Sequence, residues 1–158
     1  MPRRTQTKFI VVHCSATRPS MNLTIDTVRE WHIAKGWSDV GYHFFIQRDG
    51  TIQSGRHPDD HGAHVAGHNT DTVSVCMAGG LDDEGKPFTN RPDLFTHAQW
   101  ESAKALIAVL RRMYPHAQVL GHRDLSPDRN HDNKITQEEW IKTCPGFSAG
   151  LELGGYSE

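Results

Sequence analysis

FIVVHC, at residues 9–14, is an apolar run rich in β-branched side chains, and it predicts a buried strand. Apolar residues fall on both faces of this strand, which is typical of a sheet covered on both sides. Because side chains alternate along a strand, His13 shares a face with Phe9 and Val11. An imidazole at the strand end is either hydrogen-bonded in the core or a metal ligand that faces an open cleft.

Similar patterns predict further elements along the chain. In order, they are a helix over 24–35, a hairpin over 41–53 with a type I′ turn at Asp49-Gly50, a buried strand over 72–78, a helix over 96–114 and a short strand over 118–121. Thr24 is positioned to cap the first helix, and Thr96 begins a capping box for the second. We therefore expect an α/β fold in which helices flank a central mixed sheet.

Composition narrows the class of protein. The chain has 158 residues, which suits one domain. Its net charge of −2 gives no excess of positive charge that would attract nucleic acid or an anionic membrane. Its three cysteines show no pairing pattern, which indicates a reducing compartment. The apolar run at residues 9–12 is too short for a signal peptide or a membrane span. We expect a cytoplasmic monomer with no stable membrane insertion.

Two short segments near the C-terminus carry transition-metal donors. GHRD at 121–124 contains His122, and KTCPGF at 142–147 contains Cys144. Imidazole and thiolate are the soft donors that hold zinc, and a catalytic zinc site has three protein ligands plus water. The two segments therefore look like halves of one zinc site.

The stretch between them, DRNHDNKITQEE at 128–139, is rich in oxygen donors. It fits the EF-hand calcium loop, with ligands expected from Asp128, Asn130, Asp132, the carbonyl of Lys134 and Glu139. Asn133 replaces the usual glycine, and asparagine is the next best residue for a left-handed turn. We expect a helix over 136–142 after the loop, which calcium would order. The alternative is an Asx-rich surface turn without an ion.

Two other regions carry weaker predictions. Residues 55–72 are rich in glycine and histidine, and we interpret them as a mobile loop at the edge of a groove, in which His64 contacts substrate. His61, His64 and His68 could also form a second zinc cluster, but no cysteine or helix fixes these rings. Residues 148–158 contain three glycines and little to bury, which predicts a flexible tail.

Several motifs together resemble one known family. VHCSAT at 12–17, GW at 36–37 with DVGYHF at 39–44, RDGT at 48–51 and CPGF at 144–147 resemble the bacteriophage N-acetylmuramoyl-L-alanine amidases. These are zinc endolysins related to the peptidoglycan recognition proteins. The resemblance implies an amidase domain over 1–147, with the loop at 128–139 as an insertion. It also implies zinc held by His13, His122 and Cys144, and a catalytic pair formed by Tyr42 and Lys142.

The resemblance also implies the reaction and its alternatives. Water activated by zinc would cleave the amide between N-acetylmuramic acid and L-alanine in bacterial peptidoglycan. A phage enzyme without a signal peptide would wait in the host cytoplasm until release across the membrane. One alternative is a binding module without catalysis, against which Cys144 argues because such relatives typically lack that ligand. Another alternative is regulation of phage RNA polymerase, but nothing in the sequence indicates a surface that would bind the polymerase.

Overall fold

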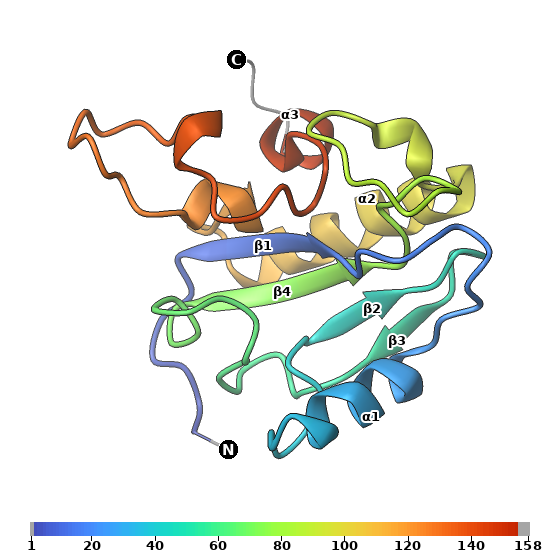
Figure 1. The fold of residues 1–158 in the computed structure, drawn as a ribbon. Helices are drawn as coiled ribbons and strands as arrows, with labels where there is room; N and C mark the ends of the chain where they lie inside the picture. The colour runs from blue at the N-terminus through green and yellow to red at the C-terminus, as the bar shows by residue number, and fades with distance from the viewer. Residues whose placement is uncertain (1, 155–158) are drawn as a thin grey trace.

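The computed structural model describes residues 2–154, which form one mixed sheet of five strands in the order β3-β2-β4-β1-β5 (Figure 1). The strands are β1 (Phe9–Cys14), β2 (Phe44–Ile46), β3 (Ile52–Ser54), β4 (Thr72–Met77) and β5 (Gln118–Gly121). Only β3 is antiparallel to its neighbour. The α/β class with a central mixed sheet is therefore confirmed.

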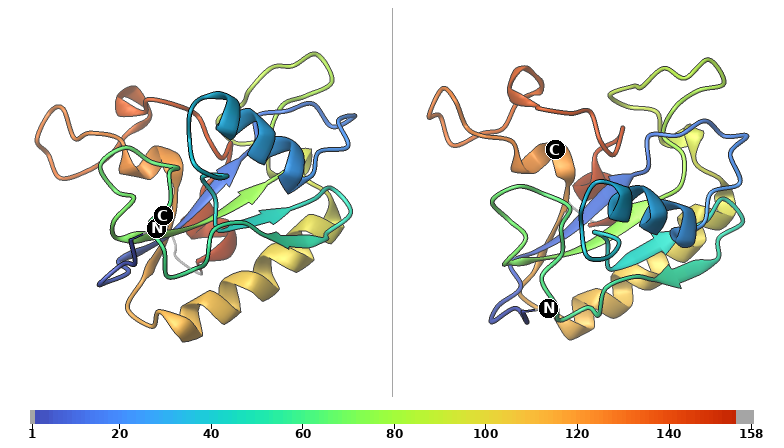
Figure 2. Two further views of the ribbon diagram at one scale, coloured as in Figure 1. Left: turned by 90° about the horizontal axis from the view of Figure 1, so that it is seen from below. Right: turned by 60° about the horizontal axis from the view of Figure 1, so that its bottom comes forward.

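Helices cover both faces of the sheet (Figure 2). α1 (Ile25–Ala34) packs Ile25 and Val28 against one face, with Phe45 and Cys76. α2 (His97–Met113) and α3 (Ala149–Leu153) pack against the other face in a larger core. Three short 3-10 helices, η1 (Pro92–Leu94), η2 (His122–Leu125) and η3 (Gln137–Glu139), lie in the connections. Within residues 2–154, no helix combines the length and apolarity needed to cross a bilayer.

The predicted helix starts are confirmed. Thr24 caps α1 by accepting a hydrogen bond from the Thr27 amide, and Thr96 and Gln99 form the reciprocal capping box of α2. Gln99 is fully buried, and its amide also donates to the carbonyls of Ile46 at 3.2 Å and Ala78 at 2.8 Å. The start of α2 is thus attached to the ends of β2 and β4.

The predicted type I′ turn is wrong, although the hairpin itself is present. Gly50 has a positive φ of 89°, whereas Asp49 does not. The Gln47 amide donates to the Thr51 carbonyl, which leaves a three-residue loop, and the Asp49 carboxylate accepts from the Thr51 amide at 2.9 Å. This side-chain bond stabilises the three-residue loop. The loop requires one left-handed residue, whereas a type I′ turn requires two.

The predicted flexible tail is wrong for residues 148–154. Ser148 accepts from the Leu151 amide and caps α3, which buries Ala149 and Leu153 in the larger core. Two apolar residues four positions apart are enough to dock one helical turn. Residues 155–158 lie outside the part that the structure describes.

The predicted helix over 136–142 is also wrong, since only η3 forms. Trp140 has an extended conformation, and its ring lies under the Arg123 guanidinium at 3.9 Å. The next amide, that of Ile141, donates to Ser126 Oγ at 3.2 Å. These contacts with η2 and the following residue keep the chain out of a helix.

Candidate metal centre

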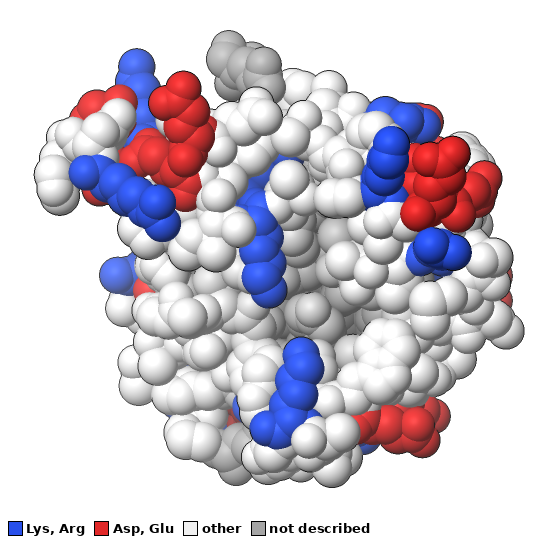
Figure 3. Space-filling model, viewed as in Figure 1, with Lys and Arg blue, Asp and Glu red and all other residues white. Residues whose placement is uncertain are grey.

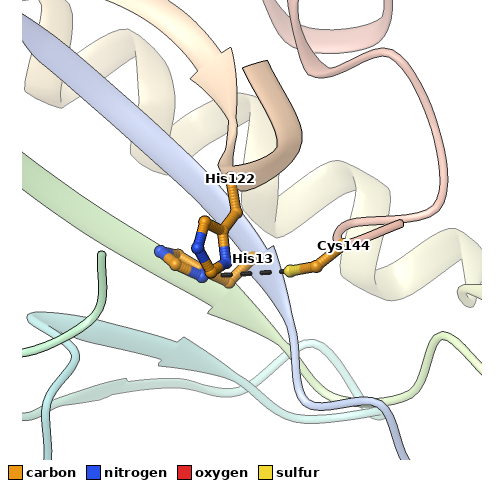
Figure 4. Close-up of side chains that lie close together, drawn as sticks. All are labelled: His13, His122 and Cys144. Atoms are coloured by element: carbon orange, nitrogen blue, oxygen red, sulfur yellow. Dashed lines mark hydrogen bonds between the residues drawn. The ribbon is translucent and has the colours of Figure 1, made fainter. Parts of the chain in front are cut away.

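Three separate segments bring His13, His122 and Cys144 together. His13 lies near the end of β1, His122 begins η2 directly after β5, and Cys144 follows the long connection from η2. β1 and β5 are neighbouring parallel strands, so their ends meet at one edge of the sheet. One donor atom from each residue lies within 4.8 Å of the other two (Figure 4). This spacing and the two-nitrogen, one-sulfur donor set fit a zinc ion.

Backbone contacts hold the cysteine in place. The Arg123 amide donates to the Cys144 carbonyl at 3.0 Å, and the Cys14 amide donates to Cys144 Sγ at 3.2 Å. The carboxylate of Asp124, two residues after His122, accepts from the Gly121 amide at 2.8 Å. It therefore orients the turn that presents His122.

Burial keeps both imidazoles in the neutral form that binds metal. It lowers the pKa of His122 from 6.5 to about 4, with a smaller effect from the Lys142 charge. Burial, followed by the neighbouring His64 and His122, lowers the pKa of His13 well below its usual value. Hydrogen bonding with Cys14, together with burial, raises the pKa of Cys144, so metal binding would have to displace its proton.

Tyr42 lies beside the candidate ligands. Its ring centroid is 5.1 Å from that of His13 and 5.5 Å from that of His32. Burial, and then the nearby thiols, raise the pKa of Tyr42 well above 10, so the phenol stays protonated and can donate a hydrogen bond. His32 was not predicted as part of this region. The only signal in the sequence was its helical spacing from Ile25 and Val28, with which it is buried on one face of α1.

Lys142 is exposed and lines a cavity of about 1030 Å³ beside the candidate centre. The loop at 63–69, residues 122–128 and Ile141 form other parts of its wall. Figure 3 shows this face hollowed in the middle, with basic side chains beside the hollow and acidic ones mainly toward the edges. The cavity can therefore accept a ligand of the size of a sugar-peptide, next to a positive charge.

The histidines of the loop at 55–72 take different positions. His64 lines the cavity and also contacts His13, with His64 Nδ1 at 2.8 Å from His13 Nε2. His61 and His68 do not join it in a metal group within residues 2–154. The second zinc cluster therefore receives no support.

The connection from Ser126 to Thr143, here called the arm, contains the oxygen-rich loop. Carboxylate oxygens of Asp128, Asp132 and Glu139 lie within 4.8 Å of one another. Asn133 adopts the predicted left-handed conformation, with φ at 64°, and its amide donates to Asp128 at 2.8 Å. The two other residues predicted as ligands take part in the same turn: Asn130 Oδ1 accepts from the Asp132 amide, and the Lys134 amide donates to Asp132.

Comparison with known proteins gives the family. The sequence pattern of the N-acetylmuramoyl-L-alanine amidases matches residues 3–147. This chain belongs to that family. Endolysins of Klebsiella phage KP32 and Escherichia phage T7 are each 40% identical to it over 145 residues, which cover 92% of this chain and 84% of each endolysin.

Solved structures show the same architecture. The N-acetylmuramoyl-L-alanine amidase LysC from Clostridium intestinale superposes with a TM-score of 0.69 and 27% identity, over 96% of this chain and 86% of LysC. Drosophila PGRP-LB superposes with a TM-score of 0.71 over 98% of this chain and 84% of that protein. Its identity of 23% supports the shared fold only.

Proposed function

We propose that this family member is a zinc-dependent peptidoglycan amidase, which cleaves the bond between N-acetylmuramic acid and L-alanine and thereby lyses bacteria. The observation that carries the proposal is the convergence of His13, His122 and Cys144 beside a cavity that His122 and Lys142 line. A structural zinc site would have four protein ligands, whereas three leave a coordination position for solvent. A module that only binds the wall would have no need of this arrangement.

Each group in the site has a role in amide hydrolysis. Zinc, when bound, supplies a Lewis acid that acidifies water and polarises a carbonyl. The Lys142 ammonium can stabilise the negative charge that develops on the carbonyl oxygen. The Tyr42 hydroxyl, protonated at neutral pH, can orient the attacking water or pass a proton to the leaving amine.

The products of the reaction test this proposal. Purified sacculi treated with the protein should release L-alanine amino termini without new reducing sugar ends. Cys144→Ser and His122→Ala should lose this release while they keep the fold, and His97→Ala, which removes a ring that is 88% exposed, should retain it. New reducing ends would identify a glycosidase instead, and full activity of both ligand variants would exclude the assigned site.

We also propose that calcium binds the arm at Asp128, Asn130, Asp132, Glu139 and the Lys134 carbonyl. The closely spaced carboxylates support this proposal, because Ca²⁺ is bound by several carboxylate and carbonyl oxygens that surround one point. Calcium would then stabilise the arm, which contains Lys142 and ends directly before Cys144. Melting temperature and lysis should fall with a calcium-selective chelator that leaves zinc bound. Glu139→Gln should abolish the difference, while Glu138→Gln, a change of the exposed neighbour, should not.

The remaining proposals concern the protein in the cell. We propose that it acts as a monomer, and that it reaches the wall from the host cytoplasm once the membrane has been opened. Sedimentation of the purified protein tests the first point. Fractionation of host cells before and after the membrane is permeabilised tests the second.

A further inference from the structure

The ring of His64 lies between His13 and Thr72. His64 Nδ1 is 2.8 Å from His13 Nε2, and His64 Nε2 is 2.9 Å from Thr72 Oγ1. Thr72 Oγ1 in turn donates to the carbonyl of His68 at 2.6 Å. The four groups form a continuous chain of hydrogen bonds that begins at the candidate metal centre and ends at a backbone carbonyl.

The direction of this chain follows from the number of protons available. A hydroxyl has one proton, and a carbonyl can only accept, so Thr72 uses its proton on His68. Thr72 Oγ1 must then accept from His64, which places a proton on His64 Nε2. In a neutral imidazole the other nitrogen is bare, so His64 Nδ1 accepts from His13 Nε2.

Geometry supports the neutral state on which this assignment depends. The two nitrogens of His64 face another imidazole and a hydroxyl, and among the described residues no carboxylate contacts the ring of His13 or His64. His13 therefore carries its proton on Nε2 and leaves Nδ1 bare. Nδ1 is the nitrogen 3.9 Å from Cys144 Sγ, on the side of the candidate centre.

The loop that carries His64 is packed closely against the segment that leads into β2. The Ala63 amide donates to the Gly41 carbonyl at 3.0 Å, and a Cβ at Gly41 would lie 2.0 Å from the Ala63 carbonyl oxygen. The His64 amide donates to Asn69 Oδ1 at 2.9 Å. A loop held at both points keeps the His64 ring in a fixed orientation, which a tautomer-setting contact requires.

We propose that His64 is a positioning residue that fixes the tautomer of His13, so that the bare Nδ1 faces the metal. Thr72 fixes the tautomer of His64 in the same way. Its hydroxyl donates its single proton to the His68 carbonyl and can only accept from His64. This inference rests on the proposed zinc site but adds a role for two residues outside the ligand set. Hydrogen bonds from metal-bound histidines to a second group commonly fix the ring and raise its basicity.

Nitrogen NMR of the zinc-free protein tests the proposal without any metal or activity. Imidazole nitrogens with and without a proton have distinct ¹⁵N shifts, so the tautomer of each ring can be read directly. We expect protons on Nε2 of both His13 and His64, with Nδ1 bare in both. A proton on His13 Nδ1 in the zinc-free protein would overturn the proposal, even if the protein binds zinc tightly.

Zinc affinity gives a second readout. His64→Ala should lower it by about 10–100-fold with little change in melting temperature, as is typical when such a partner is removed. His68→Ala, which removes a ring from the same loop but keeps the carbonyl that Thr72 needs, should leave it unchanged.

The Thr72 variants separate hydrogen bonding from packing. Thr72→Val keeps the shape but removes the hydroxyl, and it should weaken zinc binding, while Thr72→Ser should retain it. Unchanged zinc affinity in folded His64→Ala would refute the positioning role. Failure of the unaltered protein to bind zinc would instead refute the proposed function and leave the NMR result to decide the tautomer.

Discussion

Phe147→Ala is expected to damage both stability and the metal centre, because Phe147 anchors the segment that carries Cys144. Its ring is fully buried and packs edge-on against Phe95, at 5.4 Å between centroids, and Trp100, at 4.9 Å. Removal of a core phenylalanine costs about 3–5 kcal/mol. Each aromatic pair adds about 0.5–1.5 kcal/mol beyond buried area, so we expect the upper part of that range.

Leu110→Ala is the matched control, since Leu110 is equally buried in the same core but lies on α2. Urea unfolding of both zinc-free variants should show losses of several kcal/mol. Only Phe147→Ala should also weaken zinc binding, because loosening the segment by 1.4 kcal/mol costs about tenfold in affinity. Equal zinc affinities in the two folded variants would refute the idea that Phe147 holds the cysteine in place.

Three further predictions follow from single side chains. Lys142→Met should lower the rate on sacculi by about 10²–10³-fold and leave zinc affinity intact, and an unchanged rate would remove Lys142 from the mechanism. Burial lowers the pKa of His43 from 6.5 to about 4, so the unfolded chain binds more protons between these values and the free energy of unfolding should fall as pH drops through them. At 1.36 kcal/mol for each pKa unit, the full loss in the free energy of unfolding is about 3 kcal/mol. Urea unfolding curves of the zinc-free protein that do not change between pH 7 and about pH 4 would contradict this prediction. Gln99→Leu leaves buried backbone groups without hydrogen-bond partners, at a cost of about 1–3 kcal/mol for each group. Thermal unfolding of this variant should show a clear loss of stability, whereas the control Gln118→Leu, at an exposed strand position, should not.

Local sequence patterns predict much of this fold, but not how its strands are ordered. The β-branched runs give β1 and β4, and Thr96 with Gln99 marks the start of α2. By contrast, Phe9 pairs with both Thr72 and Gln118, and no local pattern shows pairings across such distances in the chain. The strand order therefore had to come from the structure.

The two errors near the C-terminus have a common physical origin in tertiary contacts. α3 forms because Leu153 finds a place in a core that the sequence of the tail does not reveal. The expected helix after the oxygen-rich loop is lost because Trp140 packs on Arg123. Helical propensity is a weak preference that such contacts override.

The candidate site shows a similar division. Motif residues point to His13, His122 and Cys144, and the structure brings their donor atoms together. The contact of His64 with His13 could not be predicted, because it depends on how a glycine-rich loop folds over the sheet. Thr72 carried no signal at all, since a threonine at the start of a strand is ordinary.

Zinc titration of the metal-free protein, followed at each point by release of L-alanine amino termini from sacculi, tests the central claim most directly. We predict that activity rises in proportion to bound zinc and saturates at one ion per chain. Cys144→Ser should show neither tight binding nor release. Metal-free protein that digests sacculi at the full rate, or Cys144→Ser that binds zinc and cleaves as the unaltered chain does, would contradict the account.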